Sequence, residues 1–598
     1  MSSQKSSKPT SVKSRYIMQF LVVMVAIIVA NVAGDIWYQR IDLTHEKRYT
    51  LSEASENLVD KLDDVVYVQV FLDGEFPSEY RLLKNAIRDM LSEFRSISSG
   101  NLEFKFEDVL ADKTIEEKEN ILRQLSSKGL QITRPEVDED DAQMEKFIIP
   151  GALVIYKDQE YPLNFLKRDF GQPLEQEINE SVELLEYEIG NVLRKCVTDR
   201  AVKIAFTTGH GELEPIEVAD IARTLEEFYI VERININITD TNSLKPFAQE
   251  LFKNPERSGE IIMNGLLDGM KAYKALIIAK PRVNFLDEEL FLIDQYVMNG
   301  GKVIWLAETL IADIDSVARY GSVMTADYNL NINDLLFRYG ARINLDLIQD
   351  LNSHGIPVLA TDGSGKPGFR PWIFYPLFAP DGEHPIVRNM TEVWGRFVSS
   401  IDTLPNKEVK KTVLLHSGQN SRVARNPVNI NINMVGMKMD PAMFTDPGKI
   451  SAVLLEGKFR SVFSHRPAMR DQSPIEFKPE IDQNSMIVIS DGDLIANQVS
   501  KDKQVYPLGY DRFASKAFNQ PIEFSNKKFF LNCVDYLCDD SNLIEVRSKK
   551  VVLRLLDKVR VKTERTRWQM INMVLPVVLI LLFGLLNAFI RKRRYTKA

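Results

Sequence analysis

The chain has 598 residues, 44% of them hydrophobic, which is enough for two to four domains with sizeable cores. Its formal net charge is −8, and this acidic balance argues against a nucleic-acid partner. Only three cysteines are present, at Cys196, Cys533 and Cys538, so a disulfide framework is excluded. The spacing of Cys533 and Cys538 matches no common zinc pair, and we interpret them as small buried residues on a helix.

An apolar run near the N-terminus predicts a transmembrane helix over residues 16–34. The run is interrupted only by Gln19 and Asn31, and it is longer than the 7–15 residues typical of a signal-peptide core. A cleaved signal peptide remains the alternative. The preceding tail, residues 1–15, is basic and has no acid, so we expect it in the cytoplasm.

Residues 35–198 form the first predicted domain. Their pattern is β-α-β-α-β-β-α, with strands at 65–73 and 102–109, helices at 78–96, 114–126 and 174–195, and two strands between the last two helices. Thr50 and Glu53 are spaced as a capping box for an additional helix at the start. The order is that of a thioredoxin-like layer, but without a CxxC pair it supports no redox chemistry.

Residues 199–546 form the second predicted domain. The strands KIAFTT, YIVERINI, KALIIAKP and VIWLAE alternate with helices, and TVLLHS, SAVLLEG and SMIVISDGD follow as later strands. This alternation predicts a doubly wound parallel sheet with helices on both faces. We expect a long loop over 354–384, where Gly, Pro and Asp accumulate, and a last helix in NKKFFLNCVDYLCD.

A second apolar run, residues 569–590, predicts another transmembrane helix, because about 20 apolar residues cross a bilayer. The tail 591–598 is basic and we expect it in the cytoplasm as well. Residues 547–568 are rich in Lys and Arg and predict a basic juxtamembrane helix, lying either on the outer membrane surface or as a solvated stalk. Within the span, Asn572, Gly584 and Asn587 predict a contact with another membrane helix.

Four polar residues after predicted strands are candidate ligand contacts. His210 and Glu212 lie in the turn after KIAFTT, where they could form an acid/base or metal pair, or only a polar turn. Asp491 and Asp493 follow SMIVIS, where they could bind a cation weakly or form a turn. No catalytic, cofactor or metal residue is assigned on this basis.

The motifs of several enzymes are missing. The fragment GSGKP at 363–367 has Pro367 in place of the Ser or Thr of a phosphate-binding loop, so we expect any ATPase to be a separate protein. HExxH and GxSxG do not occur.

Seven segments carry a resemblance to a known family. They are DLTHEKRYTLSE (42–53), EQEINESVELLEYEI (175–189), TTGHGELE (207–214), NGGKVIWLAE (299–308), SDGDLIAN (490–497), NKKFFLNCVDYL (526–537) and LLNAFIRKRRY (585–595). Together with the two terminal anchors, they resemble the GldG family of gliding-motility-associated ABC transporter components, within the wider ABC-transporter auxiliary family. The resemblance implies a permease subunit, a separate cytoplasmic ATPase, and a middle domain with a class I amidotransferase-like fold. The turns LIIAKPRV and IWLAETL lack the nucleophilic cysteine of an active amidotransferase.

The sequence thus predicts a non-catalytic subunit of an ABC transporter linked to gliding motility or secretion. We expect it in the bacterial inner membrane with most of the chain in the periplasm. Its expected partners are the permease, the ATPase reached through the permease, and membrane lipid, without a cofactor. The alternatives are a degenerate or metal-dependent hydrolase centred on His210, and a scaffold that binds an envelope polymer.

Overall fold

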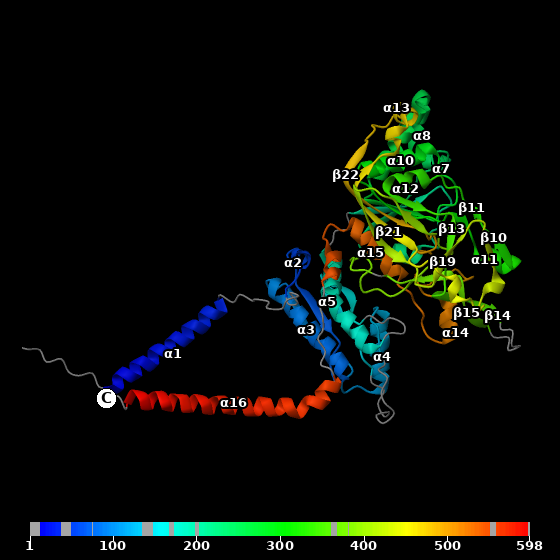
Figure 1. Ribbon diagram of the computed structural model, residues 1–598. Helices are drawn as coiled ribbons and strands as arrows, with labels where there is room; N and C mark the ends of the chain where they lie inside the picture. Colours follow the sequence, from blue (N-terminus) through cyan, green and yellow to red (C-terminus); the bar gives the residue numbers. More distant parts are fainter. Residues whose placement is uncertain are drawn as a thin grey trace, which may run out of the picture.

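The computed structural model describes residues 12–36, 50–74, 76–133, 147–166, 173–197, 202–359, 367–380, 382–549 and 558–595. The chain is a mixed α/β protein with several sheets, so the predicted α/β class is confirmed. Two long helices, α1 (Val12–Ile36) and α16 (Lys558–Tyr595), extend away from the folded body (Figure 1).

The first part of the body is a four-stranded sheet covered by helices. Its strand order is β2-β1-β3-β4, with β1 and β2 parallel and the other pairs antiparallel. The elements are α2 (Glu53–Val59), β1 (Val66–Val70), α3 (Ser78–Ile97), β2 (Leu102–Phe106), α4 (Ile115–Ser127), β3 (Gly151–Tyr156), β4 (Gln159–Asn164) and α5 (Leu174–Val197). The predicted order of strands and helices in this region is confirmed.

The start of α2 differs from the predicted capping box. Ser52 is the N-cap, and its hydroxyl accepts a hydrogen bond from the backbone N–H of Ser55. Glu53 is the first helical residue and therefore cannot close a box with Thr50, so that prediction was wrong. A complete capping box forms instead at α4, between Thr114 and Glu117.

The second part of the body is built on a nine-stranded sheet. Five strands run parallel in the order β6-β5-β7-β8-β22, and their bounds are β5 (Lys203–Thr208), β6 (Ile230–Asn235), β7 (Ala275–Ala279), β8 (Lys302–Leu306) and β22 (Glu480–Ile489). Antiparallel strands extend this sheet beyond β22, namely β21 (Ile450–Arg460), β18 (Val409–His416), β17 (Ile401–Thr403) and β12 (Ala341–Ile343). The prediction of a parallel sheet is therefore right for five strands and wrong for the other four.

Helices cover both faces of this sheet, as the strand–helix alternation predicts. Along the strands, alternate residues enter two different cores: Ile204, Phe206 and Ile277 face one, while Ala205 and Leu276 face the other. The first core includes α6 (Ala219–Leu225) and α15 (Asn526–Cys538), and the second includes α9 (Ser258–Lys271), α10 (Asp287–Met298) and α12 (Asn333–Tyr339). Pro215 precedes α6 by about a turn and lies outside the helix.

The predicted long loop over 354–384 is largely a β-hairpin. Strand β14 (Ser353–Leu359) pairs with β15 (Pro367–Phe378), and β16 (Val393–Trp394) pairs with the end of β15. Trp372 and Phe374 are fully buried in the core beneath it. The prolines and glycines that indicate a loop are tolerated because β14 is an edge strand and β15 has a second partner only at its end. Residues 360–366 lie outside the described part.

Smaller elements complete the second part of the body. The remaining strands pair two by two: β9 (Leu310–Ile311) with β11 (Ala326–Asp327), β10 (Ser322–Met324) with β20 (Asn429–Asn431), and β13 (Asp346–Asp350) with β19 (Ser421–Arg425). The short helices are α7 (Thr241–Leu244), η2 (Lys245–Phe247), α8 (Ala248–Lys253), η3 (Pro255–Arg257), α11 (Ile314–Tyr320), η4 (Ile432–Met434), η5 (Pro441–Met443), η6 (Val462–His465), α13 (Pro467–Gln472), α14 (Arg512–Phe518) and η7 (Leu543–Ser548).

The terminal helices differ in their capacity to cross a membrane. Within α16, the segment Thr563–Arg593 is long and apolar enough to span a bilayer, by length and composition alone. In α1, the described apolar segment Tyr16–Val29 is shorter than a spanning helix. In the predicted basic juxtamembrane region 547–568, η7 ends at Ser548 and α16 runs continuously from Lys558 into the apolar segment. Residues 550–557 lie outside the described part, and the juxtamembrane helix stays a prediction.

A buried ion-pair cluster joins the two parts of the body. Arg194 on α5 lies 3.1 Å from Asp535 and 3.0 Å from Asp539, both at the C-terminal end of α15. The Tyr229 hydroxyl donates to Asp535 at 2.7 Å, and the Arg194 guanidinium lies over the Phe228 ring. Burial raises the pKa of Asp535, because the desolvation of its charged form outweighs the stabilisation of that form by Arg194 and Tyr229.

We predict that replacing Arg194 with alanine destabilises the protein strongly. The change leaves Asp535 and Asp539 buried without their cation, and the loss of one partner of a buried pair costs about 3–5 kcal/mol. Urea unfolding of the full chain in mild detergent, followed by tryptophan fluorescence, measures the effect. The control is Arg257→Ala, which removes an exposed pair with Glu260 and should leave the midpoint unchanged. Equal midpoints for both variants would contradict the prediction.

Candidate functional site at the carboxyl edge of the parallel sheet

Polar residues follow the ends of four parallel strands. The chain runs from β5 to β6 on one side and then returns to β7 on the other side of β5, so the order reverses between β5 and β7. In doubly wound sheets, ligands bind outside the carboxyl ends of the strands at such a reversal. Here His210 follows β5, Lys280 follows β7, Glu308 follows β8, and Asp491 follows β22.

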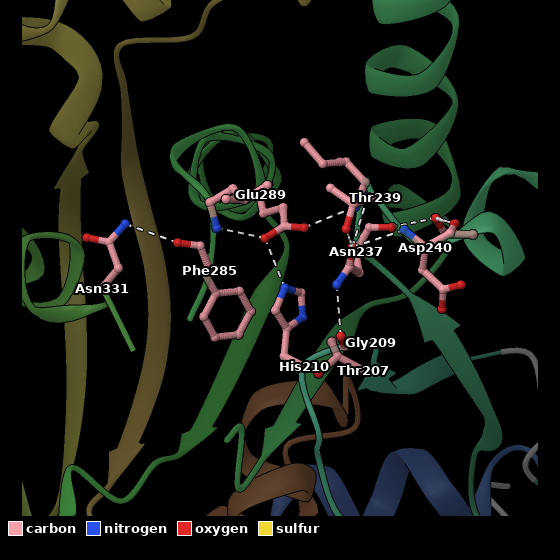
Figure 2. Close-up of polar contacts among 12 residues, drawn as sticks. Thr207, Gly209, His210, Asn237, Thr239, Asp240, Phe285, Glu289 and Asn331 are labelled. Atoms are coloured by element: carbon pink, nitrogen blue, oxygen red, sulfur yellow. Dashed lines mark hydrogen bonds and ion pairs between the residues drawn. The ribbon is translucent and has the colours of Figure 1, made fainter. Parts of the chain in front are cut away.

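His210 is fully buried and its ring is held by Glu289 of α10. The ring Nε2 lies 2.9 Å from Oε2 of Glu289, and the ring stacks on Phe285 with a centroid distance of 4.0 Å. Figure 2 shows the imidazole directed at Glu289 with Phe285 beside it. Glu289 also accepts hydrogen bonds from the backbone N–H groups of Leu286 and Ile238. Burial alone would raise the pKa of Glu289, but these hydrogen bonds and the one from His210 outweigh it and lower the pKa.

Glu212, the predicted partner of His210, has a different role. One of its oxygens accepts the backbone N–H of His210 at 2.7 Å, and the other accepts the Thr207 hydroxyl at 3.0 Å. Its distance to Nδ1 of His210 is 3.9 Å, too long for a hydrogen bond. Glu212 therefore shapes the turn, and Nδ1 of His210 has no hydrogen-bond partner among the described residues.

Backbone hydrogen bonds close the crevice between β5 and β7. The N–H groups of Arg282 and Val283 both donate to the carbonyl of His210, at 2.7 and 2.9 Å. The glycines beside His210 make this contact possible: Gly209 has φ of 109°, and a Cβ there would lie 2.4 Å from Oδ1 of Asn235. The usual ligand position is thus filled by the chain itself.

A second cluster, further along the same edge, is organised around Lys280. Its ammonium lies 2.6 Å from Asp493 and 3.2 Å from Glu308. Asp491 accepts the backbone N–H of Asp493 at 2.8 Å and that of Arg396 at 3.0 Å. A Cβ on Gly492 would lie 2.6 Å from Cγ of Lys280, so only glycine leaves room for the lysine to cross the loop.

The pKa values of the three buried acids in this cluster shift in different directions. Burial raises the pKa of Glu308 to about 8 and that of Asp491 to about 7. For Asp493, Lys280 and Arg396 outweigh burial and lower the pKa. Glu308 is 1% exposed, and neither of its oxygens has a hydrogen-bond donor within the described chain; the ion pair with Lys280 is its only compensation. Near neutral pH this edge therefore holds a proton on a buried carboxyl group.

The described residues offer no metal centre and no activated cysteine. No group of three His, Cys, Asp or Glu side chains in the described ranges is arranged to hold a metal ion. Cys533 and Cys538 are buried in α15, and burial raises the pKa of both thiols, that of Cys538 to about 12. At neutral pH these thiols stay protonated and unreactive.

The structure divides the four predicted site residues between the two clusters. His210 and Glu212 lie in the first, Asp491 and Asp493 in the second, and a ligand at either cluster stays a prediction. Sequence reasoning missed Lys280 and Glu308, although both directly follow predicted strands and the same positional rule applies to them. Glu289 had no local signal, because it reaches the site from the start of a helix.

Comparison with known proteins places the chain beside transport proteins. The family model described as an "ABC-type uncharacterized transport system" matches residues 201–533, and a domain of unknown function, DUF7088, matches residues 45–155. An uncharacterized protein of Borreliella burgdorferi is 21% identical over 580 residues, covering 96% of each chain.

Two solved structures are only distantly similar. The mmIFT52 N-terminal domain is 12% identical, covers 56% of this chain and 97% of its own, and has a TM-score of 0.29. A GH42 beta-galactosidase from G. stearothermophilus is 8% identical, covers 62% of this chain and 35% of its own, and has a TM-score of 0.17. Similarity at this level informs neither the fold nor the function.

We predict that the stability of the protein falls between about pH 5 and pH 8 and that Glu308→Gln flattens this fall. Because the pKa of Glu308 is raised to about 8, the folded state binds its proton more tightly than the unfolded state. That contribution is complete below the ordinary glutamate pKa and is lost as the pH rises through the folded value. Glutamine carries no ionisable proton, so the variant has no contribution to stability at this position that changes with pH.

Thermal unfolding of the full chain in mild detergent at a series of pH values measures this effect. The control is Glu103→Gln on β2, whose side chain is exposed and should leave the wild-type profile unchanged. A Glu308→Gln profile as steep as that of the wild type would show that Glu308 is not the titrating group.

Proposed function

This chain belongs to the family described as an ABC-type uncharacterized transport system, and on that premise we propose that it is a membrane-anchored, non-catalytic subunit of an ABC transporter linked to gliding motility or secretion. The match to residues 201–533 carries the proposal, because it makes the chain a transporter-associated subunit. The further steps, namely anchoring, partners and the absence of catalysis, rest on the arguments below.

Anchoring through both ends is supported by the terminal helices. The side chains described in the apolar parts of α1 and α16 are exposed, so these helices have no protein core of their own to enter. Basic residues flank the outer end of each, which favours the cytoplasm for both tails. We therefore place the body, residues 35–567, in the periplasm of a bacterium with both spans in the inner membrane.

The domain assignment follows from the two sheets. The order β2-β1-β3-β4, with one parallel and two antiparallel pairs, supports a thioredoxin-like domain over 35–198. The five parallel strands with helices on both faces support an amidotransferase-like domain over 199–546. The filled crevice at His210 and the protonated, buried cysteines favour a non-catalytic role over a hydrolase centred on His210.

The membrane contact is assigned to one face of α16. At 100° per residue, Asn572, Asn587 and Gly584 lie within about 120° of one another around the helix. No atom lies within 4 Å of a Cβ built on Gly584. Small and polar residues in a span favour contact with another helix, because lipid offers no hydrogen-bond partner. We assign this face to the permease, and the ATPase is then reached through the permease.

We predict that Gly584→Ile combined with Asn587→Leu weakens copurification of the permease and the ATPase severalfold. The added bulk and the lost amide disrupt close helix packing, while the body is unaffected. Purification in mild detergent with identification of the copurifying proteins measures the result. The control, Val578→Phe, adds bulk on the opposite face of α16 and should have no effect. If the permease and the ATPase copurify with the double variant as well as with the wild type, the spans only anchor the protein in the membrane and do not form the contact with the permease.

We also predict that the C-terminus is cytoplasmic and the body periplasmic. A fluorescent protein that folds only in the cytoplasm should be active when fused after residue 598. A phosphatase that is active only in the periplasm should be active when inserted between β14 and β15, at residues 360–366. A C-terminus found outside the cytoplasm would overturn the double anchor.

A further inference from the structure

A groove on the second part of the body lies away from both clusters of the carboxyl edge. It is bounded by α12, by η6 and by residues 404–408 ahead of β18, and its volume is about 720 Å³. Pockets that hold small molecules typically have volumes of about 300–1,000 Å³. None of the residues that line the groove belongs to the His210 or the Lys280 cluster.

The charges that line the groove do not balance. Its two acids already have partners: Asp334 lies 2.5 Å from Arg466, and Glu408 lies 2.6 Å from Arg460. Arg338 and Lys407 also line the groove, and within the described chain neither forms an ion pair. The groove therefore presents two uncompensated positive charges.

Arg338 carries an unmet hydrogen bond in this groove. Its Nε is shielded from solvent and has no acceptor among the described residues. A shielded donor without an acceptor is unfavourable, and a bound acceptor at this guanidinium would relieve part of that cost. A guanidinium also presents two parallel N–H groups that match the oxygens of a carboxylate or a phosphate.

The backbone around Arg338 is fixed before any ligand arrives. Leu336 and Tyr339 are buried on the core side of α12, and the Tyr339 hydroxyl donates to Asp294 at 2.8 Å. Gly340 ends the helix with φ of 111°, and its carbonyl accepts the N–H of Leu404. The end of α12 and the loop that carries Lys407 are thus held together.

An apolar surface lies beside the two cations. Phe337 lines the groove and its side chain is 54% exposed, unusually high for a phenylalanine on a helix packed against a core. We propose that this groove binds a small organic oxyanion, a carboxylate or a phosphate ester, with the charged group on Arg338 and Lys407 and an apolar group on Phe337. This site is independent of the transporter contacts proposed above.

Three matched probes test the proposal: benzoate, phenyl phosphate and benzyl alcohol, titrated against the full chain in mild detergent by calorimetry or ligand-observed NMR. We expect at least one of the two anions to bind and neutral benzyl alcohol to bind about tenfold more weakly or not at all, because it lacks the charge-assisted hydrogen bonds. The tighter of the two anions then identifies the chemical class. Absence of binding by both anions, or equal binding of benzyl alcohol, overturns the proposal.

Variants connect the binding to the named residues. Arg338→Gln should weaken the anion about tenfold, as expected for the loss of one charge-assisted contact, and Lys407→Gln should weaken it less. Arg338→Lys keeps the positive charge but loses the two parallel N–H groups of the guanidinium. Its affinity for the anion should therefore lie between those of the wild type and Arg338→Gln. Lys253→Gln, at an exposed lysine of α8, is the control and should change nothing. If Arg338→Gln does not fold, the measurement on Lys407→Gln tests the proposal by itself. Unchanged binding of the anion by that variant would then contradict the proposed site.

Discussion

The relation between the two parts of the body depends on the buried contact of Arg194 with Asp535 and Asp539. Both side chains of the central pair are nearly inaccessible to water, and Tyr229 completes the hydrogen bonding of Asp535. A buried pair of this kind is weak evidence for net stability, because desolvation offsets the attraction. Its consequence is geometric: any sliding of α5 against α15 separates the charges in a medium that cannot solvate them. The pair thus fixes how the two cores are placed.

A second buried carboxylate brings the two ends of the body together. Glu186, also on α5, accepts the backbone N–H of Ser52 at 2.6 Å and the ammonium of Lys549 at 2.8 Å. Lys549 donates in turn to the carbonyl of Thr50, so residues at opposite ends of the body share one anchor point. Arg547 binds the carbonyls of Pro385 and Arg388 in the second part. Residues from both ends of the body are therefore held on α5, the helix that also carries Arg194.

Much of the fold was predictable because it depends on continuous apolar runs. KIAFTT, KALIIAKP and VIWLAE are buried on both sides, and their composition alone identifies them as strands. The direction of β21 was not predictable, since a long antiparallel strand and a parallel one share the same apolar pattern. The hairpin of β14 and β15 was missed because its prolines and glycines indicate a loop, and only the pairing shows that β14 lies at the edge of a sheet, where such residues are tolerated. Ser52 instead of Thr50 caps α2 because Glu186, far away in sequence, holds Ser52 in place.

The candidate site shows why residue type alone identifies function poorly. His210 attracts notice in the sequence, yet its environment uses it as structure: Glu289 holds the ring, Phe285 covers it, and the carbonyl seals the crevice. Glu308 and Arg338 attract none, yet each retains polar atoms without a hydrogen-bond partner among the described residues, as does Nδ1 of His210. A buried polar group that already has all its hydrogen-bond partners gains little from contact with a ligand. A buried polar group that lacks a partner gains a hydrogen bond when a ligand supplies one. Unmet hydrogen bonding is a property of the assembled structure, so a search for conspicuous residue types in the sequence does not find candidates such as Glu308 and Arg338.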